Sequence, residues 1–222
     1  MFKYVTRLIH TIWVNLTDIL FPIRCVGCSK KDILLCVDCI KKAKNSKDES
    51  LLRRPLNRVL SYGLYENEYL RKAIMKFKYN GAYGLSNPFA HMLYEIVKPH
   101  LSSIGPDALI VPIPISRDRM RSRGYNQAKL LAESLALKIG CKSSDNLLVK
   151  SRSTTSQTSL SHEERLKNVI NSFSVNSPEL AHGKKIILVD DVMTTGATLS
   201  EAAHALKNAG AKEITGLVVA RT

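Results

Sequence analysis

The sequence predicts an α/β fold in which helices flank a mostly parallel sheet, together with a small N-terminal module built on four cysteines. Three observations support this prediction. Short aliphatic runs that suit buried strands alternate with segments of helical apolar spacing. The segment 185–211 has the pattern of a strand, a polar turn and a helix. Two Cys-X-X-Cys pairs lie close together near the N-terminus.

The composition indicates a folded and strongly basic protein. The chain has 222 residues, enough for one α/β domain and a small module. Hydrophobic residues make up 45% of it, which excludes a disordered chain. Its 33 Lys and Arg against 19 Asp and Glu give a net charge of +14. Such a charge favours a polyanionic partner, either nucleic acid or an anionic membrane face, and the alternative is a solvated lysine-rich surface.

The first twenty residues predict an amphipathic helix, because apolar residues recur there at helical spacing with polar residues between them. The stretch lacks the long uninterrupted apolar run of a signal peptide or a membrane span, so we expect a cytoplasmic protein. The helix is expected to dock on its own protein. Attachment to a partner or to the inner face of the membrane is the alternative.

The cysteine pairs predict a zinc site. Cys25 and Cys28 are followed after seven residues by Cys36 and Cys39, which supplies four thiolates for tetrahedral coordination. Two disulfides or a redox pair are the alternatives, and the reducing compartment implied by the lack of an export signal disfavours disulfides. Because all four ligands are thiolates, the predicted zinc is structural and staples a segment too small to fold without it. Lysines crowd this module and predict contact with nucleic acid or with a protein: Lys30, Lys31, Lys41, Lys42, Lys44 and Lys47.

A polar stretch separates this module from the rest of the chain. Residues 45–50 have no apolar periodicity and form the predicted linker. We therefore divide the chain into an N-terminal helix and zinc module at 1–50 and a main domain at 51–222. The fifth cysteine, Cys141, stands alone and is interpreted as a structural thiol after a helix.

The main domain is predicted to alternate strands and helices. Turn and break signals at Asn80-Gly81 and Pro99 end its first two helices. Pro112 and Pro114 are expected to prevent the second strand from continuing its ladder. Ser161 is the expected N-cap of a helix that follows a polar loop. The predicted strands are 59–65, 108–111, 147–149, 186–189 and 214–219. The predicted helices are 68–77, 86–97, 126–139 and 162–168, and the polar loop is 151–160.

Four arginines alternate with other residues just after the second strand. This density beside a strand end suits pyrophosphate or nucleic-acid phosphate, because guanidinium groups bind phosphate through two parallel hydrogen bonds. A solvated basic face is the alternative. Gly124 is expected to mark the junction between this loop and the helix that follows it. The four arginines are Arg117, Arg119, Arg121 and Arg123.

The segment 185–211 predicts a binding site for a ribose phosphate. Asp190 and Asp191 follow a short aliphatic run, and ionised carboxylates accept hydrogen bonds from the vicinal hydroxyls of a ribose. A hydroxyl-rich turn then leads into a helix, expected to end at Gly210, whose N-terminal N–H groups and partial positive charge suit a phosphate. Gly196 lets the backbone approach that phosphate closely. A generic strand-turn-helix is the alternative. The predicted phosphate-binding residues are Thr194, Thr195, Gly196, Ala197 and Thr198.

This stretch resembles the binding signature of type I phosphoribosyltransferases, which hold phosphoribosyl pyrophosphate (PRPP). The resemblance implies that Asp190 and Asp191 contact the ribose hydroxyls and that the turn 194–198 holds the 5-phosphate. Four motifs in order, VPIP, RxRxRxRGYNQ, RSTTSQTSLSHEERLKNV and DDVMTTGAT, further resemble the ComF family of competence-associated, phosphoribosyltransferase-like proteins. The match spans about residues 20–221, with Tyr125 where phenylalanine is usual.

The ComF resemblance implies a type I phosphoribosyltransferase fold in which a flexible loop, at 151–160 here, closes over PRPP. It also implies Mg²⁺ bound with the pyrophosphate, whose charge requires a counterion. Relatives are associated with moving incoming single-stranded DNA into the cytoplasm during natural transformation. Single-stranded DNA and the DNA-uptake machinery are therefore the implied partners.

Three functional hypotheses follow from these patterns. The first is a DNA-uptake protein that binds PRPP and single-stranded DNA. The second is a phosphoribosyltransferase of nucleobase salvage, in which preorganised charges would stabilise an oxocarbenium-like state. The third is a nucleic-acid-binding regulator that uses the fold as a nucleotide sensor. The cysteine module and the high charge favour the first and third, and the sequence identifies neither an acceptor nor a general base for the second.

Overall fold

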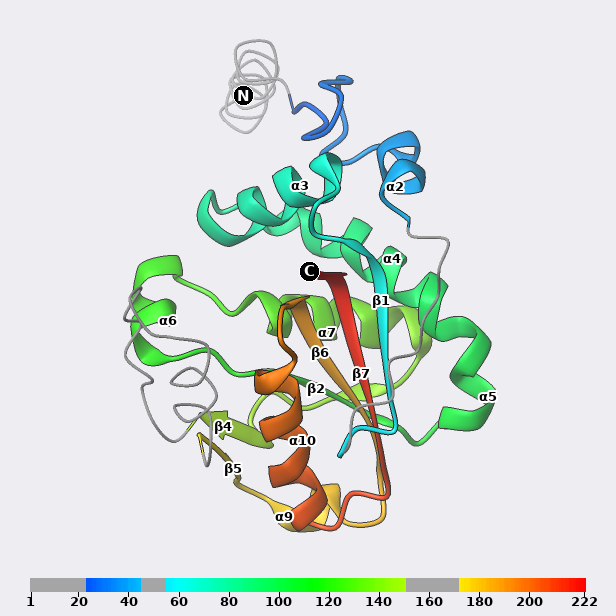
Figure 1. The fold of residues 1–222 in the computed structure, drawn as a ribbon, viewed down its shortest axis with the longest axis vertical. Helices are drawn as coiled ribbons and strands as arrows, with labels where there is room; N and C mark the ends of the chain where they lie inside the picture. Colours follow the sequence, from blue (N-terminus) through cyan, green and yellow to red (C-terminus); the bar gives the residue numbers. More distant parts are fainter. Residues whose placement is uncertain (1–22, 45–54, 151–171) are drawn as a thin grey trace, which may run out of the picture.

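The computed structural model describes residues 23–44, 55–150 and 172–222. Within them, five parallel strands form one sheet in the order β1-β7-β6-β2-β3, which places β6 at its centre (Figure 1). The predicted α/β class with a parallel sheet is thereby confirmed. The strands are β1 Arg58–Leu64, β2 Leu109–Pro112, β3 Lys142–Ser143, β6 Lys185–Met193 and β7 Glu213–Arg221.

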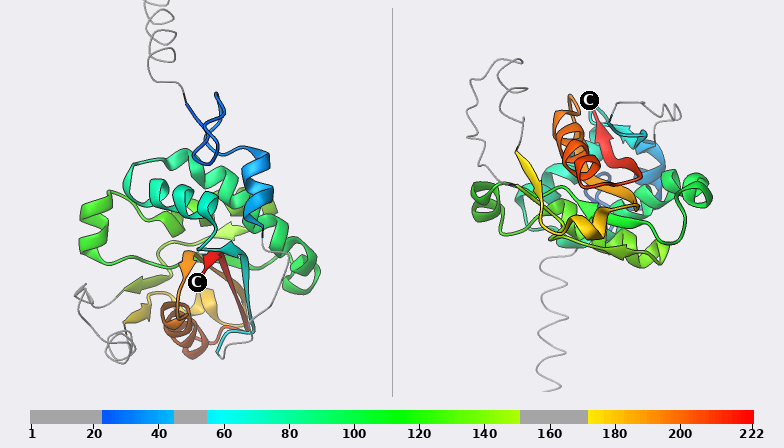
Figure 2. Two further views of the ribbon diagram at one scale, coloured as in Figure 1. Left: turned by 45° about the horizontal axis from the view of Figure 1, so that its top comes forward. Right: turned by 90° about the horizontal axis from the view of Figure 1, so that it is seen from below.

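Helices cover both faces of this sheet (Figure 2). The helices α4 (Ser86–Val97) and α7 (Gln127–Ile139) pack together on one face, and α10 (Ala197–Asn208) covers the other. Helix α3 (Glu68–Tyr79) lies beyond the carboxyl ends of the strands (Figure 1). None of the helices in the described ranges is long and apolar enough to span a membrane. The shorter helical segments are α2 Val37–Ala43, η1 Tyr83–Leu85, η2 Lys98–His100, α5 Leu101–Ile104, α6 Arg117–Arg123 and α9 Pro178–Ala181.

The boundaries of the long helices follow the capping signals in the sequence. Helix α4 occupies the predicted residues, and α3 starts as predicted but continues past Phe77 to Tyr79. Helix α7 begins after Asn126, whose Oδ1 accepts a hydrogen bond from the N–H of Ala128 at 3.0 Å. After α10, Gly210 has a φ of 86°, the left-handed conformation that a C′ glycine supplies.

The central strand is longer than predicted. The aliphatic run predicted a strand over 186–189, but β6 continues to Met193 and contains both aspartates. Strand β7 pairs with this extension, with Asp190 opposite Val218 and Met193 opposite Arg221. Pairing with a long neighbour therefore extends the strand through acidic residues whose own preference is against it.

Strand β2 ends at Pro112, one residue past its predicted end, so the ladder stops at the prolines as predicted although Pro112 itself still pairs. It lies opposite Val189, and the N–H of Ile113 donates a hydrogen bond to the Val189 carbonyl at 2.9 Å. The missing N–H of Pro112 would point to the other side, toward β3. Strand β3 pairs no further than Ile110, so the proline leaves no carbonyl of that strand without its donor.

A second, antiparallel sheet consists of β4 (Leu148–Lys150) and β5 (Phe173–Val175). The strand predicted at 147–149 is confirmed with a shift of one residue. The predicted polar loop at 151–160 and helix at 162–168 lie outside the described residues, as do the predicted N-terminal helix and the linker.

The cysteine module packs against α3 and β1. Its buried residues share one apolar cluster with those two elements. The hydroxyl of Tyr62 donates a hydrogen bond to the Ile40 carbonyl at 3.1 Å, and Nδ2 of Asn67 donates to the Lys42 carbonyl at 2.9 Å. The module is therefore held by the main domain as well as by its own cysteines. The division into 1–50 and 51–222 stays a prediction, because the predicted boundary falls outside the described residues.

Candidate functional site

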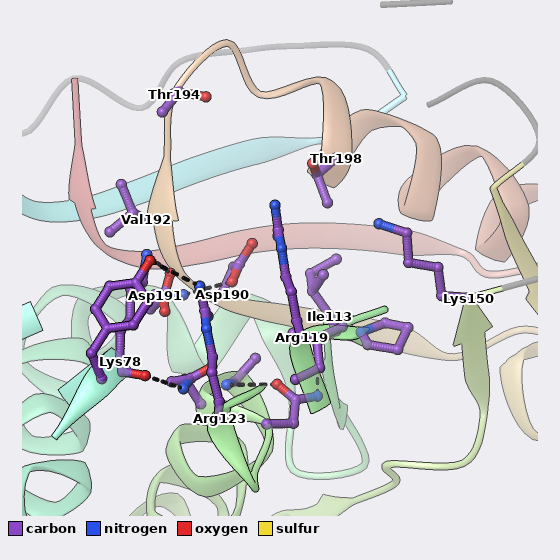
Figure 3. Close-up of a pocket in the computed structure, with 16 residues that line it drawn as sticks. Lys78, Ile113, Arg119, Arg123, Lys150, Asp190, Asp191, Val192, Thr194 and Thr198 are labelled. Carbon is purple, nitrogen blue, oxygen red and sulfur yellow. Dashed lines mark hydrogen bonds and ion pairs between the residues drawn. The ribbon is translucent and has the colours of Figure 1, made fainter. Parts of the chain in front are cut away.

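A cavity of about 390 Å³ opens at the carboxyl ends of β2 and β6 (Figure 3). Its volume lies in the range of about 300–1,000 Å³ that is typical of small-molecule sites. Its position is the one where open α/β sheets bind ligands. The lining carries more positive than negative charge. Its charged residues are Lys78, Arg119, Arg123, Lys150, Asp190 and Asp191.

The predicted acidic pair lies inside this cavity. The N–H of Asp191 donates a hydrogen bond to Oδ1 of Asp190 at 2.8 Å. Oδ1 of Asp191 forms an ion pair with Nζ of Lys78 at 2.9 Å, and the side chains are 9% and 18% exposed respectively. Because water is largely excluded from this pair, its attraction is screened less than that of a surface pair. A lysine from α3 thus fixes one of the two carboxylates.

The second carboxyl group, that of Asp190, has a pKa close to neutral pH. Burial of Asp190 and the neighbouring charge of Asp191 raise the pKa of Asp190 to about 7, against the opposing effects of the Asp191 N–H, Lys78 and Arg119. In Figure 3, Asp190 lies between the Lys78–Asp191 pair on one side and Arg119 on the other. A ligand that brings hydrogen-bond donors to Asp190 favours its ionised form.

The hydroxyl-rich turn contributes two of its five predicted residues to the lining. Thr194 and Thr198 border the cavity, whereas Thr195, Gly196 and Ala197 are not among its lining residues. Gly196 has a φ of 79° immediately before α10, so a glycine is favoured where the turn enters the helix. Oγ1 of Thr195 accepts a hydrogen bond from the N–H of Ala197 at 3.3 Å. The first turn of α10 reaches the cavity through Thr198 (Figure 3).

The arginine-rich stretch is a helix, α6, rather than the loop that its alternation indicated. Residues four apart lie on the same face of a helix. Accordingly, Arg119 and Arg123 line the cavity, whereas Arg117 and Arg121 are exposed and do not line it. The structure therefore divides the four predicted phosphate-binding residues into an inward pair and an outward pair.

Two lysines in the cavity were not identified from the sequence. Lys78 comes from the last turn of α3, and Lys150 comes from the end of β4. Burial lowers the pKa of the Lys150 ammonium group, and the charge of Arg119 adds to this effect while Asp190 opposes it. No local pattern marks either lysine as a cavity residue, since only the sheet topology brings α3 and β4 to this edge.

The four predicted zinc ligands form a second candidate site. All four Sγ atoms lie within 4.8 Å of one another, and the distances are 3.7 Å for Cys25–Cys39 and 3.5 Å for Cys28–Cys36. Tetrahedral coordination with Zn–S bonds of about 2.3 Å requires sulfurs about 3.8 Å apart. The cysteines are free thiols rather than disulfides. Their arrangement fits one metal ion held by four sulfurs.

The backbone around Cys25 favours its thiolate. The N–H of Cys36 donates a hydrogen bond to Sγ of Cys25 at 3.3 Å. Burial acts to raise the pKa of the Cys25 thiol, but the N–H groups of Cys28, Cys36 and Gly27 outweigh it and lower the pKa to about 6. Since the thiolate is the form that binds metals, these hydrogen bonds prepare the sulfur for coordination.

Other predicted residues lie away from both sites. Cys141 follows α7 outside the cluster, and its thiol donates to the Pro106 carbonyl at 3.7 Å, in keeping with a structural role. Lys47 lies outside the described residues. The remaining lysines of the cysteine module are exposed and available to an anionic partner: Lys30, Lys31, Lys41, Lys42 and Lys44.

A family model agrees with this fold. Residues 123–222 match the family model of the phosphoribosyl transferase domain. The fold class predicted from the resemblance, a phosphoribosyltransferase-like α/β fold with an N-terminal four-cysteine cluster, is thereby confirmed. Among solved structures, the allosteric regulatory enzyme of purine biosynthesis is 19% identical with a TM-score of 0.42, over 65% of this chain and 29% of that chain.

Three curated proteins are similar over most of the chain. Competence protein F of Haemophilus influenzae is 34% identical over 153 residues, which are 66% of this chain and 66% of that protein. Competence protein ComFC of Bacillus subtilis is 33% identical over 178 residues, 79% of this chain and 67% of that protein. DNA utilization protein YhgH of Salmonella typhi is 31% identical over 171 residues, 76% of this chain and 74% of that protein. The chain thus spans about two thirds of the first two relatives.

Proposed function

The chain belongs to the ComF family of competence-related proteins with a phosphoribosyltransferase fold, and on that premise we propose that it binds PRPP in the strand-end cavity and handles single-stranded DNA during natural transformation. One observation supports the ligand above all others. An acidic pair and the first turn of a helix border the same cavity, so acceptors for ribose hydroxyls and donors for a phosphate lie within one molecule's reach.

The ribose 5-phosphate half of PRPP fits the β6–α10 side of the cavity. Asp190 and Asp191 would accept hydrogen bonds from the two ribose hydroxyls. The 5-phosphate would lie at the N-terminus of α10, against Thr194 and Thr198, where N–H groups and the helix dipole favour an anion. Thr195, Gly196 and Ala197 are not among the lining residues, so Thr194 and Thr198 carry the proposed contact with the phosphate.

The pyrophosphate half fits the cationic side. Arg119 and Arg123 from α6 and Lys150 from β4 border the same cavity as the acidic pair. Guanidinium groups bind phosphate oxygens through paired hydrogen bonds, and a new anionic neighbour favours the charged form of the partly buried Lys150. Mg²⁺ would accompany the pyrophosphate, since it prefers phosphate and carboxylate oxygens and the cavity supplies the carboxylates.

For the cysteine module we propose a structural zinc ion held by Cys25, Cys28, Cys36 and Cys39. Three of these residues are buried and the sulfurs have the spacing that one tetrahedral ion requires. A complete set of thiolate ligands leaves no position for a reacting water, so the ion would supply folding free energy rather than chemistry. The proposed role of the module is to present its exposed lysines to DNA or to a protein of the uptake machinery.

The proposed DNA partner follows from charge. The net charge of +14 and the exposed lysines and arginines described above favour a phosphate backbone without selecting a sequence. We place this activity in the cytoplasm, where the incoming strand would arrive. The logarithm of the affinity for a poly-dT strand should fall linearly with the logarithm of the salt concentration, because each phosphate contact releases a counterion. A salt-independent affinity would reject this part of the proposal.

The ligand is tested by calorimetry of the full chain with Mg²⁺ and three compounds: PRPP, ribose 5-phosphate and pyrophosphate. Because the two halves of the cavity bind the two halves of PRPP, PRPP should bind more tightly than either fragment. Equal affinity for PRPP and pyrophosphate would contradict a ribose site at the acidic pair. No binding of PRPP would reject the assignment of the cavity.

A further inference from the structure

An exposed tyrosine lies at the rim of the cavity beside an arginine. Tyr79, the last residue of α3, is 61% exposed and lines the cavity together with Arg123 of α6. The guanidinium carbon of Arg123 lies 5.0 Å from the centre of the Tyr79 ring, and Nη2 of Arg123 donates a hydrogen bond to the Tyr79 hydroxyl at 3.3 Å. A cation this close to an aromatic ring is attracted to the π-system.

Buried contacts hold this pair in place. Nη1 of Arg123 donates a hydrogen bond to Oε1 of Gln127 at 3.0 Å, and Gln127 is only 1% exposed. Nε2 of Gln127 donates in turn to the Lys78 carbonyl at 3.5 Å, directly before Tyr79. The chain of contacts links α7 to the end of α3. Tyr79 and Arg123 are therefore positioned before any ligand arrives, although most of the tyrosine faces water.

The neighbouring tyrosines are occupied by packing. Tyr83 is 53% exposed, but its ring centre lies 4.5 Å from that of Tyr125 at an interplanar angle of 64°. Tyr125 packs edge-on against Phe77, and its hydroxyl donates a hydrogen bond to the Phe77 carbonyl. Of the three tyrosines, Tyr79 is the one that lines the cavity.

We propose that Tyr79 and Arg123 form a platform on which one unpaired base of single-stranded DNA stacks at the mouth of the cavity. The inference rests on the proposed DNA-handling function and adds the contact that recognises a base rather than a phosphate. Every base has a π-face, so stacking on tyrosine is tolerant of sequence. An arginine already in contact with the ring adds a cation–π contribution.

A base carried by a strand fits this surface better than a free base. The platform is open to solvent, whereas a free base gains affinity mainly in an enclosing pocket. The outward pair of α6, Arg117 and Arg121, is exposed on the same helix that supplies Arg123. These two guanidinium groups would bind the phosphates that flank the stacked base, which a free base lacks.

The test compares two oligonucleotides of equal length and charge, poly-dT and an abasic strand, by fluorescence anisotropy with the full chain. The wild type should bind poly-dT about five- to 150-fold more tightly, the effect of stacking one base. Equal affinity for the two strands would overturn the platform. If PRPP still binds in calorimetry, that result leaves the proposed cavity function standing and rejects the stacking inference alone.

Substitutions test whether the preference for poly-dT depends on the Tyr79 ring. Tyr79→Ala should lose most of the poly-dT preference while its affinity for the abasic strand stays within about twofold, and Tyr79→Phe should keep the preference because the ring remains. Tyr94→Ala is the matched control, since Tyr94 also lies near lysine ammonium groups but does not line the cavity. Equal loss in Tyr94→Ala, or equal loss for both strands in Tyr79→Ala, would overturn the assignment. Tighter binding of free thymine than of poly-dT would overturn the choice of a strand.

Discussion

The four-cysteine module and the strand-end cavity obtain their functional residues in different ways. The module takes all its candidate metal ligands from residues 25–39, whereas the cavity takes its charged residues from segments between Lys78 and Asp191. Local spacing decides the first arrangement, and sheet topology decides the second. The module should therefore fail completely when one ligand is lost, whereas the cavity should weaken in steps as single residues are changed.

Loss of a metal ligand should have the largest effect. Cys36→Ser removes a buried thiolate, and a structural zinc ion contributes on the order of 10–16 kcal/mol to the folding of such modules. Metal analysis should find one zinc per wild-type chain and less than about half of that in the variant, with a lower melting temperature. Cys141→Ser, outside the cluster, is the matched control and should retain its zinc. Wild-type zinc content in Cys36→Ser would contradict the assignment.

The second largest effect should come from the contact between the cysteine module and strand β1 of the main domain. A Cβ added at Gly63 would lie 2.3 Å from the Ala43 carbonyl oxygen and 2.8 Å from Cδ2 of Leu70, so Gly63→Ala forces α2 away from β1. Such overpacking costs about 1–3 kcal/mol, measured as a lower free energy of unfolding in urea. Gly216→Ala, with its nearest atom at 3.3 Å, is the milder control. If Gly63→Ala is as stable as the wild type, the module does not depend on this contact.

Substitutions on the two faces of α6 should differ in their effect on PRPP affinity. Arg119→Gln removes an inward guanidinium and should weaken PRPP binding about tenfold or more, because a charged hydrogen bond contributes about 1.5–3 kcal/mol. Arg117→Gln removes an outward charge and should change the affinity by about twofold at most. Calorimetry on both variants makes the comparison. Equal weakening would show that the arginines act through net charge and not by contact.

The smallest expected effect is that of pH. Because the pKa of Asp190 is raised to about 7, this carboxyl is protonated below that pH and is then a weaker acceptor for a ribose hydroxyl. PRPP affinity should therefore rise several-fold as the pH increases through about 7, and Asp190→Asn should remove this part of the dependence. The same raised pKa predicts that the free energy of unfolding of the ligand-free protein falls as the pH rises from about 4 to about 7. In this range the folded state holds a proton on Asp190 that the unfolded chain has released. An unchanged pH profile in Asp190→Asn would contradict this role.

The sequence predicted those features that local residues determine. The cysteine cluster follows from two short spacings, and the end of α10 follows from Gly210 with its positive φ. Helix α6 also has local signals at both ends. At its start, Oγ of Ser116 accepts a hydrogen bond from the Arg119 N–H at 3.4 Å, and at its end Gly124 has a φ of 79°. The prediction of a loop there relied on the alternation of the arginines rather than on these capping residues.

Other features depend on contacts that no local pattern contains. The extension of β6 through the aspartates requires its pairing with β7. Lys78 and Lys150 reach the cavity because α3 and β4 end at the same edge of the sheet. Tyr79 lines the cavity whereas Tyr83 packs edge-on against Tyr125, and this difference depends on which elements surround each ring.

The most direct test of the central claim is calorimetry with PRPP and Mg²⁺ on the wild type and on Asp191→Asn. The amide keeps the shape of the side chain but weakens the acceptor, so the affinity should fall about tenfold to a hundredfold while thermal melts show an intact fold. Asp118→Asn, on the exposed side of α6, is the matched control and should bind like the wild type. If Asp191→Asn binds PRPP as tightly as the wild type, the acidic pair does not hold the ribose and the account of the cavity is wrong.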